Sequence, residues 1–172
     1  MARALRLLAQ RDHSRAELER KLSAHRVLGR ARSDGLEADS ADDLLPASRD
    51  EVTRVLDELQ RTGWLNDERA AEALVRARSA RYGPRRLEQV LRQRSFGAEL
   101  IARSVASTRA SELERAREVW VRRFGQAPGD ARERARQMRF LIGRGFDSQT
   151  AAEVVRGGSV DDNGAATAEP VD

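Results

Sequence analysis

The residues best suited to catalysis or metal binding are few in this sequence. The chain has two histidines, His13 and His25, and no cysteine, so thiolate ligands and disulfides are excluded. No further ligands surround the histidines, and we expect His13 to lie at the surface or in a turn. A glycine-rich phosphate loop with its lysine is also missing. We therefore predict a protein that is not an enzyme and that has no catalytic residues, cofactor or metal site.

Most carboxylates are spaced for ion pairing along helices rather than for acid–base chemistry. They precede a basic residue by four positions, as Glu17 precedes Lys21 and Asp57 precedes Arg61. Pairs at this spacing face the same side of a helix and stabilise it by roughly 0.2–0.5 kcal/mol each. The carboxylates therefore indicate a solvated helical surface.

Several arginines lack such a local partner, and guanidinium groups are suited to binding phosphates and carboxylates. Arg94 and Arg144 are 50 residues apart, as are Arg86 and Arg136, so each pair falls at equivalent positions of a repeat. A repeated basic position would form a stripe that could follow a phosphate backbone or a filament. Alternatively, each is a solvated side chain lying over apolar helix surface. The candidate contact residues are Arg78, Arg81, Arg85, Arg86, Arg94, Arg136, Arg139 and Arg144.

The elements that would position these arginines follow a repeated apolar pattern. Phe96 precedes Ile101 by five residues and Val105 by nine, and the same spacing follows Phe146, 50 residues later. It also follows Val27, once an insertion of roughly 20 residues is removed. Apolar residues at helical spacing place about three helices in each unit. A period of this length is typical of stacked helical repeats that bind large partners.

The predicted fold is all-α, with three tandem three-helix repeats stacked into an elongated curved body. The first repeat covers 1–66 and contains an acidic flexible insertion at about 28–50. The second repeat covers 67–109 and the third covers 110–156, followed by a disordered acidic tail at 157–172. Each repeat is too small to bury a core comfortably by itself, so stacking is expected.

Helix starts and core positions can also be predicted. A Ser or Asp followed three residues later by Glu is the pattern of a helix-capping box. It occurs at Ser14/Glu17, Ser48/Glu51, Ser111/Glu114 and Asp130/Glu133. We expect the large aromatic residues to lie in the core rather than to stack on bases. They are Trp64, Phe96, Trp120, Phe124, Phe140 and Phe146.

Charge is unevenly distributed along the chain. The net charge is +4, but the predicted folded body is basic, whereas the insertion and the tail are acidic. A basic body is compatible with binding to nucleic acid or to an acidic protein surface. We find no targeting signal and no apolar run long enough for a bilayer, and we predict a cytoplasmic protein without a membrane partner.

Four segments of the chain form an ordered set that is specific to one family. They are His13–Leu18 with Lys21 and Leu22, Gly63–Arg69, Arg81–Leu87 with Leu91, and Ala135–Leu141 with Arg144–Phe146. The set resembles the motifs of the RecX family, bacterial regulators of the RecA recombinase, and spans about residues 2–156. Two departures are Ala70, where the family usually has an aromatic, and Ser95, where a glycine is typical. The insertion at 28–50 is a third.

The resemblance implies three tandem three-helix units and a role in regulation. Such a protein would bind the RecA–DNA filament along its helical groove and inhibit or modulate RecA ATPase, strand exchange and co-protease activity. It would thereby regulate recombination, DNA repair and the SOS response. The implied partner is the RecA filament, with single-stranded or duplex DNA inside it as a further contact, and the protein would act as a monomer.

The main alternative is a helix-turn-helix regulator that binds DNA directly, without RecA. Short helix pairs joined by tight turns also build such domains. Against this, no single helix concentrates side chains that could read bases. A third interpretation, an α-repeat protein bound to RNA or the ribosome, depends only on charge.

Overall fold

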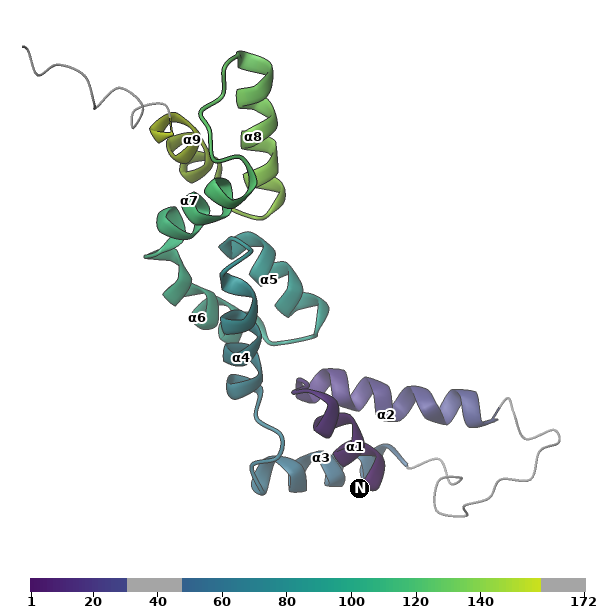
Figure 1. Ribbon diagram of the computed structural model, residues 1–172. Helices are drawn as coiled ribbons and strands as arrows, with labels where there is room; N and C mark the ends of the chain where they lie inside the picture. Colours follow the sequence, from purple (N-terminus) through teal and green to yellow (C-terminus); the bar gives the residue numbers. More distant parts are fainter. Residues whose placement is uncertain (31–47, 159–172) are drawn as a thin grey trace, which may run out of the picture. The chain divides into compact units, whose positions relative to one another are not determined.

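The computed structural model describes residues 1–30 and 48–158 (Figure 1). In these residues all regular structure is helical, which confirms the all-α repeat class. The predicted insertion at 28–50 lies mostly outside the described residues, as does the predicted tail at 157–172. The helices are α1 (Ala2–Gln10), α2 (Arg15–Arg30), α3 (Arg49–Arg61), α4 (Asp67–Ser79), α5 (Pro84–Gln93), α6 (Ala98–Arg109), α7 (Glu112–Arg123), α8 (Ala131–Gly143) and α9 (Ser148–Gly157).

The chain divides into two compact units. Unit 1 comprises Met1–Ala73 with Leu91–Leu100, and unit 2 comprises Leu74–Val90 with the chain from Ile101 onward. The divisions fall inside α4, α5 and α6. Within the described ranges, no helix combines the length and apolar character needed to cross a membrane.

The core of unit 1 is built by α1, α2 and α3. Leu18 of α2 and Leu56 of α3 are fully buried in it. The predicted capping box at the start of α3 is confirmed: the Ser48 hydroxyl accepts from the Glu51 N–H at 3.2 Å, and the Glu51 carboxylate accepts from the Ser48 N–H at 2.5 Å. Two backbone N–H groups at the N-terminus of α3 are thereby satisfied.

The turn between α1 and α2 contains a buried polar cluster. His13 lies in this turn as expected, but it is 2% exposed rather than at the surface. Its Nδ1–H donates to the Arg11 carbonyl at 2.9 Å, so Nε2 is left to accept from Lys21 Nζ at 3.0 Å. Glu17 pairs with Arg11 and, at 3.5 Å, with Lys21. Ser14 accepts from the Glu17 N–H at 3.1 Å and so caps α2 as predicted.

Burial, together with the neighbouring positive charges, favours neutral His13. Burial lowers the pKa of the His13 imidazole below its ordinary value of 6.5, and Arg11 and Lys21 lower it further against the opposing effects of the Arg11 carbonyl and Glu17. Burial raises the pKa of the Glu17 carboxyl, but the hydrogen bond and charge of Arg11, with the charges of His13 and Lys21, outweigh this effect and lower it.

Acid should therefore destabilise unit 1 in two steps. As pH falls below about 6.5, the unfolded state takes up the His13 proton before the folded state does, so the free energy of unfolding decreases. Glu17 adds a second loss at lower pH, because its folded pKa lies below 4.5. In His13→Asn, which keeps an N–H for the Arg11 carbonyl, urea unfolding at a series of pH values should lack the first step. An unchanged decline just below pH 6.5 would contradict this assignment.

The turn after α3 departs from one prediction. Gly63 has φ +76° and ends the helix, but it is Leu65 that folds back and is buried, with its N–H bonded to the Leu59 carbonyl at 2.9 Å. Trp64 is 62% exposed, so its predicted place in the core is wrong. Arg69 fixes this turn by donating to the Gly63 and Trp64 carbonyls at 3.1 and 3.2 Å.

The core of unit 2 is largely formed by α7, α8 and α9 (Figure 1). Phe146 and Leu141 are fully buried, and Trp120 is 5% exposed, which confirms two of the predicted core aromatics. Gln137 occupies the place where the other repeats have leucine, and it is also buried. Its amide is satisfied, because it accepts from Trp120 Nε1 at 2.7 Å and donates to the Gln126 carbonyl at 3.3 Å.

The predictions for the remaining core aromatics and helix caps are confirmed only in part. Phe96 is buried, whereas Phe124 and Phe140 are partly buried against the unit 2 core. The predicted cap at Ser111 is wrong, because its backbone is not extended and its hydroxyl accepts from Arg115 Nε at 3.3 Å. Asp130 caps α8 by accepting from the Glu133 N–H at 2.7 Å. Glu133 reaches back to the Gly129 N–H instead of completing a capping box.

Candidate functional site

Within unit 2, two turns from distant parts of the sequence contact each other through their backbones. The turn before α5 donates the Gly83 N–H to the Arg144 carbonyl at 3.0 Å and the Arg85 N–H to the Gly145 carbonyl at 3.2 Å. We call this contact the turn junction, formed by residues 82–86 and 144–147. It places three of the predicted contact arginines, Arg85, Arg86 and Arg144, at one location.

Glycine is required on both sides of the turn junction. A Cβ on Gly83 would lie 2.4 Å from backbone atoms of Gly145, and a Cβ on Gly145 would lie 2.4 Å from the Arg86 nitrogen. Gly145 also has φ +88°, a left-handed conformation that other residues rarely adopt. The two turns can therefore approach closely only because neither carries a side chain there.

The arginines at the turn junction are held by specific contacts. The Arg144 guanidinium lies over the rings of Phe140 and Tyr82, 4.9 and 5.7 Å from their centroids. Arg85 pairs with Asp147 at 2.6 Å, and Arg86 is exposed. Contacts between cations and aromatic rings fix a guanidinium without neutralising its charge. Arg144 can therefore present its positive charge in a defined position.

Arg115 of α7 stabilises the turn before α5 through hydrogen bonds to backbone carbonyls. Its guanidinium donates to the carbonyls of Ser79 at 2.8 Å and Tyr82 at 3.1 Å, and also to that of Thr108. Burial lowers the pKa of Arg115 from its ordinary value, against the opposing charges of Glu112 and Glu118. The group remains protonated at neutral pH, so it acts as a permanent donor that orients the turn before α5.

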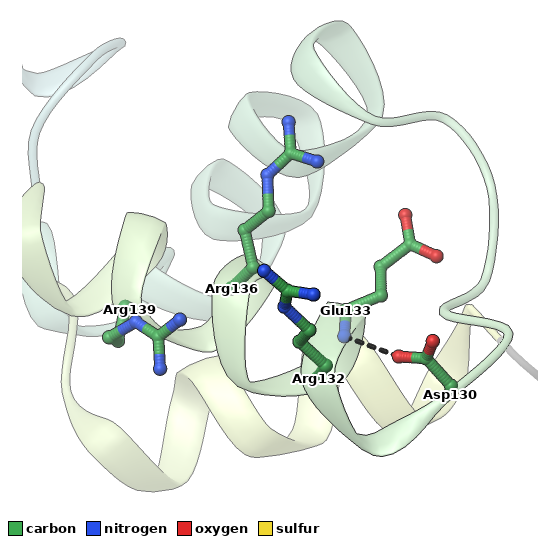
Figure 2. Close-up of a pocket in the computed structure, with 5 residues that line it drawn as sticks. All are labelled: Asp130, Arg132, Glu133, Arg136 and Arg139. Carbon is green, nitrogen blue, oxygen red and sulfur yellow. Dashed lines mark hydrogen bonds between the residues drawn. The ribbon is translucent and has the colours of Figure 1, made fainter.

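A second basic location lies along α8. A pocket of about 470 Å³ is lined there by Asp130, Arg132, Glu133, Arg136 and Arg139. Figure 2 shows that these side chains come from α8 and from Asp130, the residue before it. We call this the α8 pocket. Arg132, Arg136 and Arg139 follow one another at intervals of four and three residues, which places them along one face of the helix.

The α8 pocket keeps a positive character despite its two carboxylates. Asp130 and Glu133 accept from backbone N–H groups at the start of the helix, as described above. The Arg136 guanidinium lies 5.8 Å from the centroid of Phe124. Within the described part of the chain, none of the three arginines forms an ion pair. The pocket is thus suited to an anionic group.

The structure brings together some of the predicted contact residues. Arg136 and Arg139 share the α8 pocket, and the Arg81 carbonyl accepts from Arg144 at 3.4 Å near the turn junction. Arg78 lies half-buried near the end of α4. Arg94 belongs to unit 1, where its carbonyl accepts from the Ser14 hydroxyl. Whether any of these side chains contacts a partner stays a prediction.

Two residues of these locations were missed from the sequence. Arg132 lines the α8 pocket, and its position four residues before Arg136 was a signal that could have identified it. Arg115 gave no such signal, because its acceptors lie 36 and 33 residues earlier in the chain. In the ranges 1–30 and 48–158 we find no group of three His, Asp or Glu side chains placed to hold a metal ion.

Comparison with known proteins identifies the family. Residues 66–105 match the family model of the second three-helix domain of RecX, and residues 110–155 match that of the third. A regulatory protein RecX from Leptothrix cholodnii is 44% identical over 154 residues, which cover 90% of this chain and 85% of that protein. Another, from Ralstonia nicotianae, is 40% identical over 156 residues, which cover 91% of this chain and 86% of that protein.

A solved structure shares the fold. The crystal structure of RecX from Lactobacillus salivarius superimposes with a TM-score of 0.68 at 17% identity, covering 92% of this chain and 94% of that one. The resemblance drawn from the four sequence motifs is thereby confirmed. Because relatives match at 40% identity or more along nine tenths of the sequence, the chain belongs to the RecX family of regulatory proteins.

Proposed function

We propose that the protein binds the RecA–DNA filament and restrains RecA, reducing ATP hydrolysis, strand exchange and repressor co-cleavage. The observation that carries this proposal is membership in the RecX family, whose motifs are those of RecA regulators. The turn junction and the α8 pocket supply basic groups that could contact such a filament. A helical repeat has the further advantage that contacts to successive protomers reinforce one another through effective concentration.

The direct test is RecA ATPase activity on single-stranded DNA, with and without the full chain. We expect inhibition that saturates near stoichiometric ratios of protein to filament sites. No effect at such ratios would refute the proposal. If the protein retards duplex DNA in a sequence-specific manner while leaving RecA unchanged, the direct DNA-binding alternative is correct.

Charge reversal should identify the contacting arginines. Arg86 and Arg139 are exposed, and neither forms an ion pair in the described structure. We expect the pair Arg86→Glu with Arg139→Glu to raise the concentration for half-maximal inhibition of the ATPase by roughly tenfold or more, because each reversal replaces attraction with repulsion. The matched control is Arg49→Glu with Arg54→Glu, which makes the same change of charge on exposed positions of α3 in unit 1. Equal loss in both pairs would show that only net charge matters.

A further inference from the structure

Within unit 2, guanidinium groups and aromatic rings form a continuous line from the turn junction to the α8 pocket. At its centre the rings of Phe140 and Phe124 meet edge to face, with their centroids 5.2 Å apart. The Arg144 guanidinium lies 4.9 Å from the Phe140 centroid, and the Arg136 guanidinium lies 5.8 Å from the Phe124 centroid. Tyr82 adds a third ring, 5.7 Å from Arg144. We call this surface the arginine–ring ladder, formed in order by Tyr82, Arg144, Phe140, Phe124 and Arg136.

The guanidinium groups of the ladder keep their positive charge. In the described part of the chain neither Arg136 nor Arg144 forms an ion pair. Arg144 donates to the Arg81 carbonyl at 3.4 Å, and that acceptor is neutral. A ring attracts a cation through its quadrupole and so orients the guanidinium without cancelling its charge. The ladder therefore presents two positive groups whose positions are fixed by the rings between them.

The rings of the ladder are themselves partly accessible. Tyr82, Phe124 and Phe140 are only partly buried, whereas Trp120 and Phe146 lie in the core of the same unit. Flat apolar surface thus lies directly beside the positive groups. A ligand that uses the whole ladder must supply anionic groups and flat apolar groups in alternation.

Single-stranded nucleic acid has this alternation. Each nucleotide carries one phosphate, which guanidinium groups bind well, and one base. In a single strand the unpaired base can stack on an aromatic ring or on a guanidinium plane. A duplex presents its phosphates but keeps its bases stacked inside the helix, and an acidic peptide presents carboxylates without a flat ring at each step. The chemistry of the ladder therefore favours a single strand over both.

We propose that the arginine–ring ladder binds single-stranded DNA directly and without sequence preference. Arg136 and Arg144 contact phosphates, and Phe124 and Phe140 are positioning residues that hold the two guanidinium groups apart and in place. This binding does not depend on the proposed function. Its consequence for RecA rests on that function, because the protein would then hold the DNA of the filament as well as the recombinase.

The test measures binding of the full chain to fluorescein-labelled oligothymidylate by fluorescence anisotropy, without RecA and over a series of salt concentrations. We expect Arg136→Gln/Arg144→Gln to weaken binding at low salt by roughly tenfold or more. The dependence of log affinity on log salt should also become less steep, by about 0.7 for each lost phosphate contact. The matched control, Arg49→Gln/Arg54→Gln, removes the same charge from exposed positions of α3 and should weaken binding much less.

The rings are tested without any change of charge. Phe124→Leu/Phe140→Leu should weaken binding by roughly fivefold, because the guanidinium groups must then be ordered when the strand binds. Trp64→Leu removes an exposed ring from unit 1 and should leave binding unchanged. Circular dichroism and the fluorescence of buried Trp120 verify that the variants fold. If the double leucine variant does not fold, Arg136→Lys replaces it, since this exposed position keeps its charge but loses the planar group and should also bind more weakly.

Several results would overturn the proposal. Absence of oligothymidylate binding by the native chain at low salt would refute it, and equal losses in the two arginine pairs would show that only net charge matters. Equal affinity for poly-glutamate would assign the ladder to an acidic protein surface, and equal affinity for a duplex would show that the rings do not select a single strand. If the strand binds as expected but RecA ATPase is unaffected, the ladder stands and the proposed function fails. Inhibition of RecA by a chain that does not bind oligothymidylate would have the opposite meaning.

Discussion

Gly145→Ala should lower the free energy of unfolding of unit 2 more than an alanine substitution at any other glycine described above. The new Cβ would lie 2.4 Å from the Arg86 nitrogen and 2.5 Å from its Cβ, and the residue would keep φ +88° only under strain. Backbone overlap at this distance forces the two turns apart and breaks their hydrogen bonds. We expect a loss of about 3 kcal/mol or more in the free energy of unfolding. Urea denaturation followed by the fluorescence of buried Trp120 measures it, because Trp64 is already exposed.

Gly143→Ala is the matched control for this prediction. Gly143 ends α8 two residues earlier, is exposed, and has no neighbouring group within 4 Å of the place that an alanine methyl would occupy. Alanine should be neutral there or stabilise the helix by up to about 1 kcal/mol. If Gly145→Ala lowers the free energy of unfolding while Gly143→Ala leaves it unchanged or raises it, the loss can be attributed to the turn junction. A similar small change at both would show that the junction can open without cost.

Arg115→Met is the second variant that we expect to lower the free energy of unfolding strongly. Removal of the guanidinium leaves the carbonyls of Ser79, Tyr82 and Thr108 without their donor, while methionine preserves most of the apolar stem. At about 1 kcal/mol for each lost bond, we expect the free energy of unfolding to fall by about 2–4 kcal/mol. The same denaturation experiment measures the loss.

Two further variants define the role of Arg115. Arg117→Met changes an exposed arginine on the same helix and should cost less than about 0.5 kcal/mol. Arg115→Lys should recover only part of the loss, because a single ammonium cannot reproduce the fork of a guanidinium toward several carbonyls. If Arg115→Met and Arg117→Met were equally mild, water would have to replace the guanidinium at all three acceptors.

The sequence was informative where structure depends on neighbouring residues. Periodicity predicted the helical class, and local spacing predicted the capping box at Ser48 and the cap at Ser14. Trp64 was misplaced because two apolar residues follow Gly63, and only three-dimensional packing selects Leu65 for the core. Only the structure shows that Ser95 has φ +61°, a left-handed conformation that glycine adopts most easily.

Contacts between distant segments could not be predicted in the same way. Gln137 stands where the other repeats have leucine, but its partner Trp120, 17 residues away, makes it a satisfied core residue. Of the candidate arginines, spacing grouped Arg136 with Arg86, whereas the structure groups it with Arg132 and Arg139 in the α8 pocket. Helical spacing describes one helix face well, but it does not say which faces and turns meet.

The residue that starts the second helix of each repeat limits how the array could grow by duplication. The carbonyl of Arg94 receives the Ser14 hydroxyl, and the carbonyl of Arg144, 50 residues later, receives the Gly83 N–H. At the corresponding start of α8, Asp130 uses its carboxylate to cap its own helix. A copied repeat placed after α9 would bring a carbonyl oxygen to this helix start, where the side chain can only accept. That carbonyl would have to bind the backbone N–H of Asp130, as the Arg144 carbonyl binds that of Gly83. Lengthening the array, by evolution or by design, would therefore favour a residue at position 130 that both caps the helix and donates, as Ser14 does.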